Sequence, residues 1–501
     1  MKKTKKTITI LLSSALMLTL FSACGTNTAV ENTETNVAET ETPSETQVTE
    51  ILESEKEKEN AEGEKGKGGT PPEKPDGNGP GGAPPGGAPG GKPGSSSSAD
   101  LTYSASTEIT SAASENGKTY SSSTADESAL LISTTDDVTI SNMTVTKTGD
   151  SDGGDNCNFY GLNAAVLVKD GANVTIEGGS IESSADGANG VFCYGGNGGQ
   201  NGATGDGTTL TIKNAKITTS GDGSGGIMTT GGGITYADDL EVETSGRSSA
   251  AIRTDRGGGT VVVDGGTYTS NGLGSPAIYS TADITVSNAT LVSNLSEGVC
   301  IEGKNSITLI DCDLTANNTK TNGNATFLDT IMIYQSMSGD ADSGTSSFTM
   351  EGGSLTSKSG HVFHVTNTNA VINLKNVTIN NDDDDNILLS VCDDGWSGAS
   401  NIATLNATKQ QLSGAILVGE GSTLTLNLSD GSSFEGCISG TVINNSGTIV
   451  SNTVGTVNVT LDSSSTWTLT ADSYVTSFSG NASNVVSNGY TLYVNGTALT
   501  K

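Results

Sequence analysis

A nine-residue pattern recurs along most of this chain and restricts the folds it can adopt. The pattern places apolar residues at positions 1, 3 and 8 and Asn, Gly or Asp at position 5, as in VTISNMTVT (138–146) and LTIKNAKIT (210–218). Further copies begin at residues 174, 261, 284, 307, 348 and 372, and a shortened copy, ITYADDLEV, begins at Ile234. A period of roughly 20 to 50 residues is typical of solenoids. The sequence therefore predicts a stack of similar coils.

A second, shorter pattern precedes most copies and begins with Gly or Ala followed by an apolar residue. AVLV (165–168), GVFC (190–193) and AIYS (277–280) are examples. Each coil thus carries three short strands, which we name a (the short pattern), b (the start of the nonamer) and c (its end). Alternate residues of a strand point to one side, and stacking coils about 4.8 Å apart merges their apolar side chains into one core. A parallel β-helix meets these requirements.

The fifth position of the nonamer marks a bend between strands b and c. Its residues are types that tolerate a left-handed backbone conformation, and we expect the Asn side chains to stack as a ladder. They are Asn142, Gly178, Asn214, Gly265, Asn288, Asp311, Gly352 and Asn376.

With this ladder the chain resembles the right-handed parallel β-helix superfamily of pectin and pectate lyases, over about residues 128–440. The resemblance implies an all-β, right-handed parallel β-helix solenoid of about 11 to 13 coils. It also implies that a polysaccharide would lie along the outer surface of the a strands. The final sixty or so residues, with longer alternating strands, look like the C-terminal coils of bacterial β-helix adhesins.

The N-terminal part has a different composition and predicts an anchor and a tether. Residues 1–23 combine a basic start, MKKTKK, with a short apolar run, as in a signal peptide. SAC before residue 25 resembles the lipobox of bacterial lipoproteins, which implies lipidation of Cys24; an ordinary secretory signal is the alternative. Residues 24–98 are Glu/Thr-rich and then Gly/Pro-rich, as in disordered tethers. We expect the β-helix over 99–440, C-terminal coils or a cap over 441–501, and an extracytoplasmic, lipid-anchored protein exposed at the surface of a bacterium.

Charge and composition limit the classes of partner that the chain can bind. The formal net charge of −32 argues against nucleic acid or anionic lipid surfaces. An extracellular glycan, or the surface of a host or neighbouring cell, is a partner that fits this charge better. The protein would contact the membrane only through its N-terminal lipid. The chain has 2 His and no CxxC motif, so zinc is not indicated. Six cysteines remain, in no spacing that supports a pairing: Cys157, Cys193, Cys300, Cys312, Cys392 and Cys437.

The outward positions of the a strands are too apolar for open solvent. Long insertions adjoin these strands, and two interpretations stay open. Either the insertions fold over this face and bury it, or the face is a groove that offers aromatic and Met side chains to a sugar chain. His364 is expected to point inward, into the core. The groove interpretation assigns glycan contacts to Phe192, Met228, Tyr279, Met332, Phe363 and Trp396.

All three arginines of the chain fall between residues 247 and 256. Arg253 takes an outward position of an a strand and Arg256 begins the following turn. The resemblance to pectate lyases implies a catalytic base here, beside acids that hold Ca²⁺ against a uronate. The alternative is an ion pair of either arginine with Asp255 or Glu302.

Two runs of aspartates bracket one a strand farther along the chain. Carboxylates on loops suit Ca²⁺, which takes six to eight oxygen ligands, and paired carboxylates also perform glycosidic acid/base chemistry. A solvated acidic turn is the alternative. The candidate calcium ligands are Asp382, Asp383, Asp384, Asp385, Asp393 and Asp394.

These features lead to two functional hypotheses. The first is a non-catalytic, lipid-anchored surface protein that binds extracellular polysaccharide or acts as an adhesin, with Ca²⁺ as a candidate cofactor. The second is an enzyme, a Ca²⁺-dependent polysaccharide lyase or a glycoside hydrolase, that acts on the outer face of the a strands. The absence of a complete catalytic motif favours the first.

Overall fold

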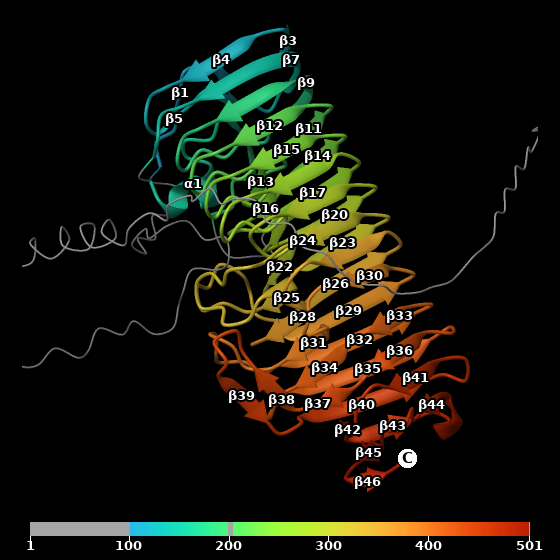
Figure 1. Ribbon diagram of the computed structural model, residues 1–501. Helices are drawn as coiled ribbons and strands as arrows, with labels where there is room; N and C mark the ends of the chain where they lie inside the picture. The colour runs from blue at the N-terminus through green and yellow to red at the C-terminus, as the bar shows by residue number, and fades with distance from the viewer. Residues whose placement is uncertain (1–100, 152, 199–203, 500–501) are drawn as a thin grey trace, which may run out of the picture. The chain divides into compact units, whose positions relative to one another are not determined.

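The structure is a computed structural model that describes residues 101–151, 153–198 and 204–499. The predicted signal peptide, Cys24 and the predicted tether lie outside the described residues. The described chain is a parallel β-helix, as the repeat predicts (Figure 1). Within these ranges, no helix combines the length and the apolar character needed to cross a membrane.

The a strands form one parallel sheet of 13 strands, the a-sheet. Each strand pairs with the equivalent strand of the next coil, which agrees with the predicted number of coils. In order, they are β2 (Glu108–Ile109), β6 (Leu130–Ser133), β8 (Val166–Lys169), β10 (Val191–Tyr194), β13 (Ile227–Thr230), β16 (Ile252–Thr254), β19 (Ile278–Ser280), β22 (Val299–Glu302), β25 (Asp329–Tyr334), β28 (His361–Thr366), β31 (Ile387–Val391), β34 (Ala415–Val418) and β37 (Ile438–Ser439).

The b strands form a second parallel array, the b-sheet. Two long strands, β7 (Asp137–Lys147) and β9 (Asn173–Ser183), run through the bend and supply both the b and the c strand of their coils. The other b strands are β3 (Ala113–Asn116), β11 (Thr209–Lys213), β14 (Gly233–Asp238), β17 (Gly259–Asp264), β20 (Asp283–Ser287), β23 (Ser306–Ile310), β26 (Thr345–Glu351), β29 (Asn369–Lys375), β32 (Ile402–Thr408), β35 (Thr423–Ser429), β40 (Thr456–Leu461) and β43 (Ser477–Ser479).

The c strands form two separate ladders. The first consists of β4 (Thr119–Ser122), parts of β7 and β9, β12 (Lys216–Thr219), β15 (Glu241–Thr244), β18 (Thr267–Ser270), β21 (Thr290–Ser293), β24 (Asp313–Ala316), β27 (Ser354–Ser357) and β30 (Thr378–Asn381). The second consists of β33 (Gln411–Ser413), β36 (Ser433–Gly436), β41 (Thr466–Leu469) and β44 (Val485–Val486).

Short elements surround this scaffold. β1 (Ser104–Ala105) pairs with β5 (Glu127–Ser128), and the helix α1 (Asp155–Tyr160) lies in the insertion before β8. An antiparallel hairpin, β38 (Thr441–Ile443) and β39 (Ile449–Asn452), interrupts the coils, which then continue in β40 and β41. The chain ends with β42 (Ser473–Val475), the 3-10 helix η2 (Ala482–Asn484), β45 (Leu492–Val494) and β46 (Thr497–Ala498).

The predicted bend between strands b and c is confirmed. All eight residues at the fifth nonamer position have a positive φ, for example 53° at Asn142 and 72° at Gly265. The Asn ladder is only partly present, because Gly and Asp interrupt it. Asn142 Nδ2 donates to Asn116 Oδ1 over 3.0 Å, whereas Asn288 Nδ2 donates to Asp264 Oδ1 over 2.7 Å.

The inward side chains of all three strands form one continuous apolar core. In β11, for example, Leu210 and Ile212 are buried and Thr211 between them points outward. The same alternation repeats in each coil, so the outward residues of each sheet form columns along the solenoid. These columns decide which surfaces a ligand can reach.

Candidate functional site

The outer face of the a-sheet is covered from β8 to β34, and only its end strands are more exposed, with Glu108 in β2 and Ser439 in β37. Strand register places ten residues in one outward column, and none is more than 9% exposed. The column is Leu167, Phe192, Met228, Arg253, Tyr279, Cys300, Met332, His364, Ser390 and Leu417.

Three apolar clusters seal this face. Phe159 and Tyr160 of α1 pack with Leu167 and Phe192, and a Cβ on Gly161 would lie 2.9 Å from the Phe192 ring. Farther along, Trp396 packs with residues of the a strands, and its ring centre lies 4.9 Å from that of Tyr334. The hairpin β38–β39 supplies Val442 to the third cluster. Of the two open interpretations, burial by the insertions therefore describes the structure.

The six predicted glycan contacts lie beneath this cover or inside the core. Phe192, Met228, Tyr279, Met332 and Phe363 are at most 1% exposed, and Trp396 is 2% exposed. These side chains form apolar packing with the insertions, and a sugar chain has no access to them in this arrangement.

The predicted orientation of Phe363 and His364 was wrong. Phe363 pairs with Ile331, an inward residue, and packs on Phe348 with ring centres 5.8 Å apart. His364 pairs with Met332 and therefore faces outward. β28 is longer than most a strands, and the sequence placed the start of its short pattern one residue too early. The expected directions of the two side chains were therefore exchanged.

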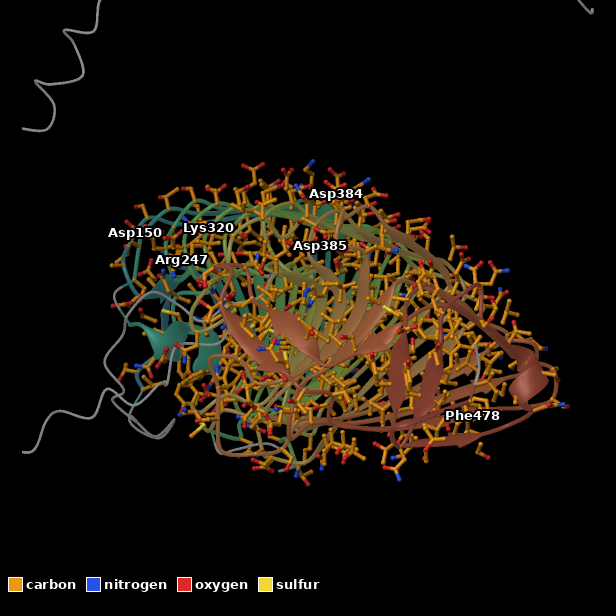
Figure 2. All side chains as sticks on the ribbon, turned by 60° about the horizontal axis from the view of Figure 1, so that its bottom comes forward. Asp150, Arg247, Lys320, Asp384, Asp385 and Phe478 are labelled. Carbon is orange, nitrogen blue, oxygen red and sulfur yellow. The ribbon has the colours of Figure 1, made fainter. Side chains whose placement is uncertain are left out.

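Two of the three arginines form ion pairs, as the alternative interpretation holds, although only one of the two partners was predicted. Arg253 Nη2 lies 2.7 Å from Asp255 Oδ2, with both side chains buried. Arg256 Nη2 lies 2.6 Å from Asp340 Oδ1, and its guanidinium packs over the Phe159 ring at 4.1 Å. The third arginine, Arg247, is exposed (Figure 2).

Burial controls the protonation of this cluster. Burial raises the pKa of the Asp255 carboxyl to about 7, against the opposing charge of Arg253. Glu302 does not pair with an arginine; it accepts hydrogen bonds from Tyr279 Oη over 2.5 Å, Tyr334 Oη over 3.1 Å and Ser336 Oγ. Burial also raises the pKa of Glu302. In this arrangement, the charged groups bind the insertions to the a-sheet.

A second polar cluster, which sequence reasoning missed, lies near β28 and β31. Ser390 Oγ is 2.7 Å from Nδ1 of both His361 and His364, and His364 Nε2 is 3.3 Å from Asp394 Oδ2. Burial, and then the neighbouring His364, lower the pKa of His361 to about 3. Serine, histidine and aspartate are the residue types of a nucleophilic triad. All three side chains are buried here, so no substrate reaches the Ser390 hydroxyl.

The predicted calcium ligands do not form one cluster. Asp382 pairs with Lys358 at 2.6 Å, Asp383 accepts the Gly360 backbone N–H, and Asp384 and Asp385 are exposed (Figure 2). In the second run, Asp393 accepts Asn401 Nδ2, whereas Asp394 accepts both the N–H and the hydroxyl of Thr326. Across the described ranges, no group of three or more His, Cys, Asp or Glu side chains is placed to hold a metal ion.

None of the described cysteines forms a disulfide. Cys300 and Cys392 take part in the clusters that seal the a-sheet, and Cys193 and Cys312 lie in the core. Burial raises the pKa of Cys193 to about 12. These thiols contribute packing in the structure.

The outer face of the b-sheet remains open. Its central column is mostly Thr and Asn, and an amide ladder occupies one end: Asn406 Nδ2 donates to Asn373 Oδ1, and Asn427 Nδ2 to Asn406 Oδ1, each over 2.9 Å. The column is Thr139, Thr175, Thr211, Tyr236, Val262, Thr285, Thr308, Thr349, Asn373, Asn406 and Asn427.

One aromatic side chain breaks this column. Tyr236 is 45% exposed and stands where the neighbouring coils have Thr211 and Val262. It lines a shallow hollow of about 330 Å³ together with Lys213, Asp238 and other residues of β11, β14 and β17. Lys213 Nζ lies 3.5 Å from Asp238 Oδ2.

The sequence did not identify Tyr236 as an outward residue, because the shortened repeat was taken to begin at Ile234, one residue too early. The register pairs Leu210 with Thr235, not with Ile234, so Tyr236 takes the outward position. The signal was present in the sequence, since Asp239 then falls at the bend and has a φ of 50°.

Comparison of the chain with protein-family models, curated proteins and solved structures finds no match in any of the three. Function must therefore be argued from the surfaces themselves.

Proposed function

We propose that the protein is a non-catalytic, lipid-anchored surface protein that recognises an extracellular polysaccharide on the open face of its b-sheet. The exposed ring of Tyr236 carries this proposal. An aromatic ring offers an apolar surface with a polar tip, which suits the C–H faces and hydroxyl groups of a sugar. The predicted signal segment, Cys24 and tether support the location outside the cytoplasm.

The surroundings of Tyr236 fit this role. Lys213, Asp238 and Asp264 line the same hollow and offer a donor and acceptors to sugar hydroxyl groups. The Thr column extends along the solenoid on both sides, so successive coils present similar hydroxyl groups to a repeating chain. The charge of −32 disfavours a polyanionic ligand. A neutral polysaccharide is therefore the proposed ligand class.

Binding to a glycan array and affinity electrophoresis in soluble neutral polysaccharides test the proposal. We expect retention by at least one neutral polysaccharide, and at least about fivefold weaker binding in Tyr236→Ala, since loss of a well-placed aromatic stacking contact costs about 1 to 3 kcal/mol. Tyr490→Ala is the matched control, because Tyr490 is 39% exposed and lies near the C-terminus. Equal binding by Tyr236→Ala and the wild type would refute the assignment to this face.

The same array with a chelator tests the calcium prediction. On our proposal, binding is unchanged when divalent cations are removed. If the chelator abolished binding, and a joint Asp384→Asn and Asp385→Asn variant reproduced that loss, recognition would move to the aspartates.

A further inference from the structure

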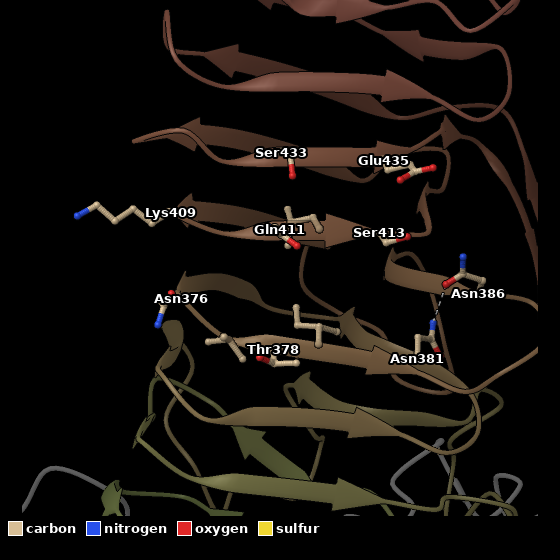
Figure 3. A pocket seen from close by; sticks show the side chains of 12 residues that line it. Asn376, Thr378, Asn381, Asn386, Lys409, Gln411, Ser413, Ser433 and Glu435 are labelled. Carbon is tan, nitrogen blue, oxygen red and sulfur yellow. Dashed lines mark hydrogen bonds between the residues drawn. The ribbon is translucent and has the colours of Figure 1, made fainter. Parts of the chain in front are cut away.

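A strand-wide slot interrupts the ladder of c strands. β30 pairs with β27 on one side and β33 pairs with β36 on the other, but no strand pairing joins β30 to β33, both of which are fully described. The coils remain in contact elsewhere, because β29 pairs with β32 and β31 pairs with β34. The opening holds a cavity of about 650 Å³ (Figure 3).

The turns that follow the two strands explain the slot. Residues 382–386 connect β30 to the next a strand, whereas Gly414 alone connects β33 to β34. A Cβ on Gly414 would lie 2.6 Å from the backbone oxygen of Asn386. The short turn therefore fixes the end of β33 against the a-sheet. The longer acidic turn lets β30 lie apart from β33.

The walls of the slot present backbone groups. Asp382 N donates to Ser357 O on the β27 side, and Gly414 N donates to Glu435 O on the β36 side. Because alternate residues of a strand direct their N–H and C=O to opposite sides, Ile379 and Asn381 direct theirs into the slot from β30. Gln411 and Ser413 do the same from β33.

A side-chain amide already occupies one end of the slot as a peptide group would. Gln410 Oε1 accepts the N–H of Val377 over 2.8 Å, and Gln410 Nε2 donates to Val377 O over 2.7 Å and to Gln411 O over 2.9 Å. The amide thus joins the two strands through the donors and acceptors of a polypeptide backbone. Gln410 is 1% exposed, so this arrangement is built into the fold.

The inner side of the slot is apolar and its ends are charged. Each of the other c strands of the first ladder places a buried apolar residue inward, such as Leu355 in β27. Ile379 is only half-buried, beside Leu412 across the slot. Lys409 stands at one end, and Glu435 stands at the other together with Asn381 (Figure 3). The acidic turn 382–386 begins directly after Asn381.

We infer that the slot binds an extended segment of another polypeptide as an inserted, parallel β-strand. Strand addition uses backbone hydrogen bonds for affinity and alternate side chains for specificity. The segment would place one apolar side chain between Ile379 and Leu412, with small residues on either side. A basic residue would follow near the acidic turn, as Lys358 at the end of β27 pairs with Asp382 at 2.6 Å. This function is independent of the proposed glycan surface.

The probe is a synthetic peptide, acetyl-Gly-Ser-Leu-Thr-Ser-Lys-amide, which has the sequence of residues 353–358. Fluorescence anisotropy with the full chain measures its binding. Two further peptides carry N-methyl groups on alternate residues, one on Ser and Thr of the central four, the other on Leu and the last Ser. Because an inserted strand is hydrogen-bonded on both sides, we expect each methylated peptide to bind at least about tenfold more weakly.

The outcomes separate the alternatives. Loss of affinity in only one methylated peptide would indicate addition to an ordinary sheet edge, and loss in neither would exclude strand pairing; both overturn the inference, as does the absence of binding by the unmodified peptide. Ile379→Asp should abolish binding, whereas Ile310→Asp, at a residue 38% exposed on the b-sheet, should not. Self-association of the protein that Ile379→Asp abolishes would assign the slot to a second copy and contradict a separate partner. The methylated peptides decide the matter even if Ile379→Asp fails to fold.

Discussion

The outer faces of the a-sheet and the b-sheet arise from the same repeat, but the first is buried and the second is open to solvent. The a-sheet face carries large apolar and charged side chains beneath insertions, whereas the b-sheet face carries partly exposed Thr and Asn. The difference follows from the turns. The bend between strands b and c is fixed by one left-handed residue, while the turns next to strand a accept long insertions. In this solenoid, the insertions cover one face and leave the other open to solvent.

The largest effect should come from truncating an aromatic side chain on the sealed face. Phe192→Ala removes a ring packed between Leu167 and α1, and such truncations cost about 4 kcal/mol in the free energy of unfolding. Tyr236→Ala, on the open face, should change it by no more than about 0.5 kcal/mol. Guanidinium unfolding followed by circular dichroism measures both. Similar costs for the two variants would remove the distinction between the faces.

Breaking the buried ion pair should have the next largest effect. Arg253→Ala leaves Asp255 buried beside the insertions without its partner, which costs about 3 kcal/mol. Arg247→Ala is the matched control, because Arg247 is exposed and donates a hydrogen bond to Asn322 Oδ1 over 3.0 Å, so its cost should be no more than about 1 kcal/mol. A negligible cost for Arg253→Ala would mean that solvent reaches the pair, contrary to a sealed face.

The pH dependence of stability sharpens the comparison further. The pKa of Asp255 is about 7 in the folded protein, against an ordinary value of 3.8, so the folded state binds more protons between these pH values. The contribution of Asp255 to stability is therefore largest below pH 4 and falls as the pH rises towards 7. Asp255→Asn removes this contribution.

We expect the wild type to lose stability relative to Asp255→Asn between pH 5 and pH 8, by at least about 1 kcal/mol, since one pKa unit corresponds to about 1.4 kcal/mol. Thermal unfolding at the two pH values measures the difference. Asp384→Asn, at an exposed residue, should show no such change. A constant difference between wild type and Asp255→Asn would show that the carboxyl titrates as in solvent.

The smallest effect is expected on the amide ladder of the open face. Asn406→Ala removes hydrogen bonds to Asn373 and Asn427, and because these side chains contact water the cost should be about 0.5 kcal/mol. A loss of several kcal/mol would mean that the ladder stabilises the solenoid as strongly as the covered face does. Chemical unfolding distinguishes the two outcomes.

Local patterns predicted the solenoid, while contacts between distant segments decided the surfaces. The period-2 alternation and the fifth nonamer residue identified the strands and their bend, because both are set within a coil. The pairing of Arg256 with Asp340, or of His364 with Asp394, joins residues of different coils and leaves no periodic pattern in the sequence. The errors at Phe363 and Tyr236 have a different origin. The repeats that contain these two residues differ from the neighbouring copies, so the motif was placed one residue too early in each.

Hydroxyl-radical footprinting of the full chain, read out by mass spectrometry, tests most directly whether one face is sealed and the other open. Met337 is 54% exposed and Tyr236 is 45% exposed, whereas Met228, Met332 and Tyr279 are at most 1% exposed. We predict fast oxidation of the first two residues and strong protection of the other three until the protein unfolds. Oxidation of Met228 and Met332 at the rate of Met337 would show that the a-sheet face is open, and would contradict the account.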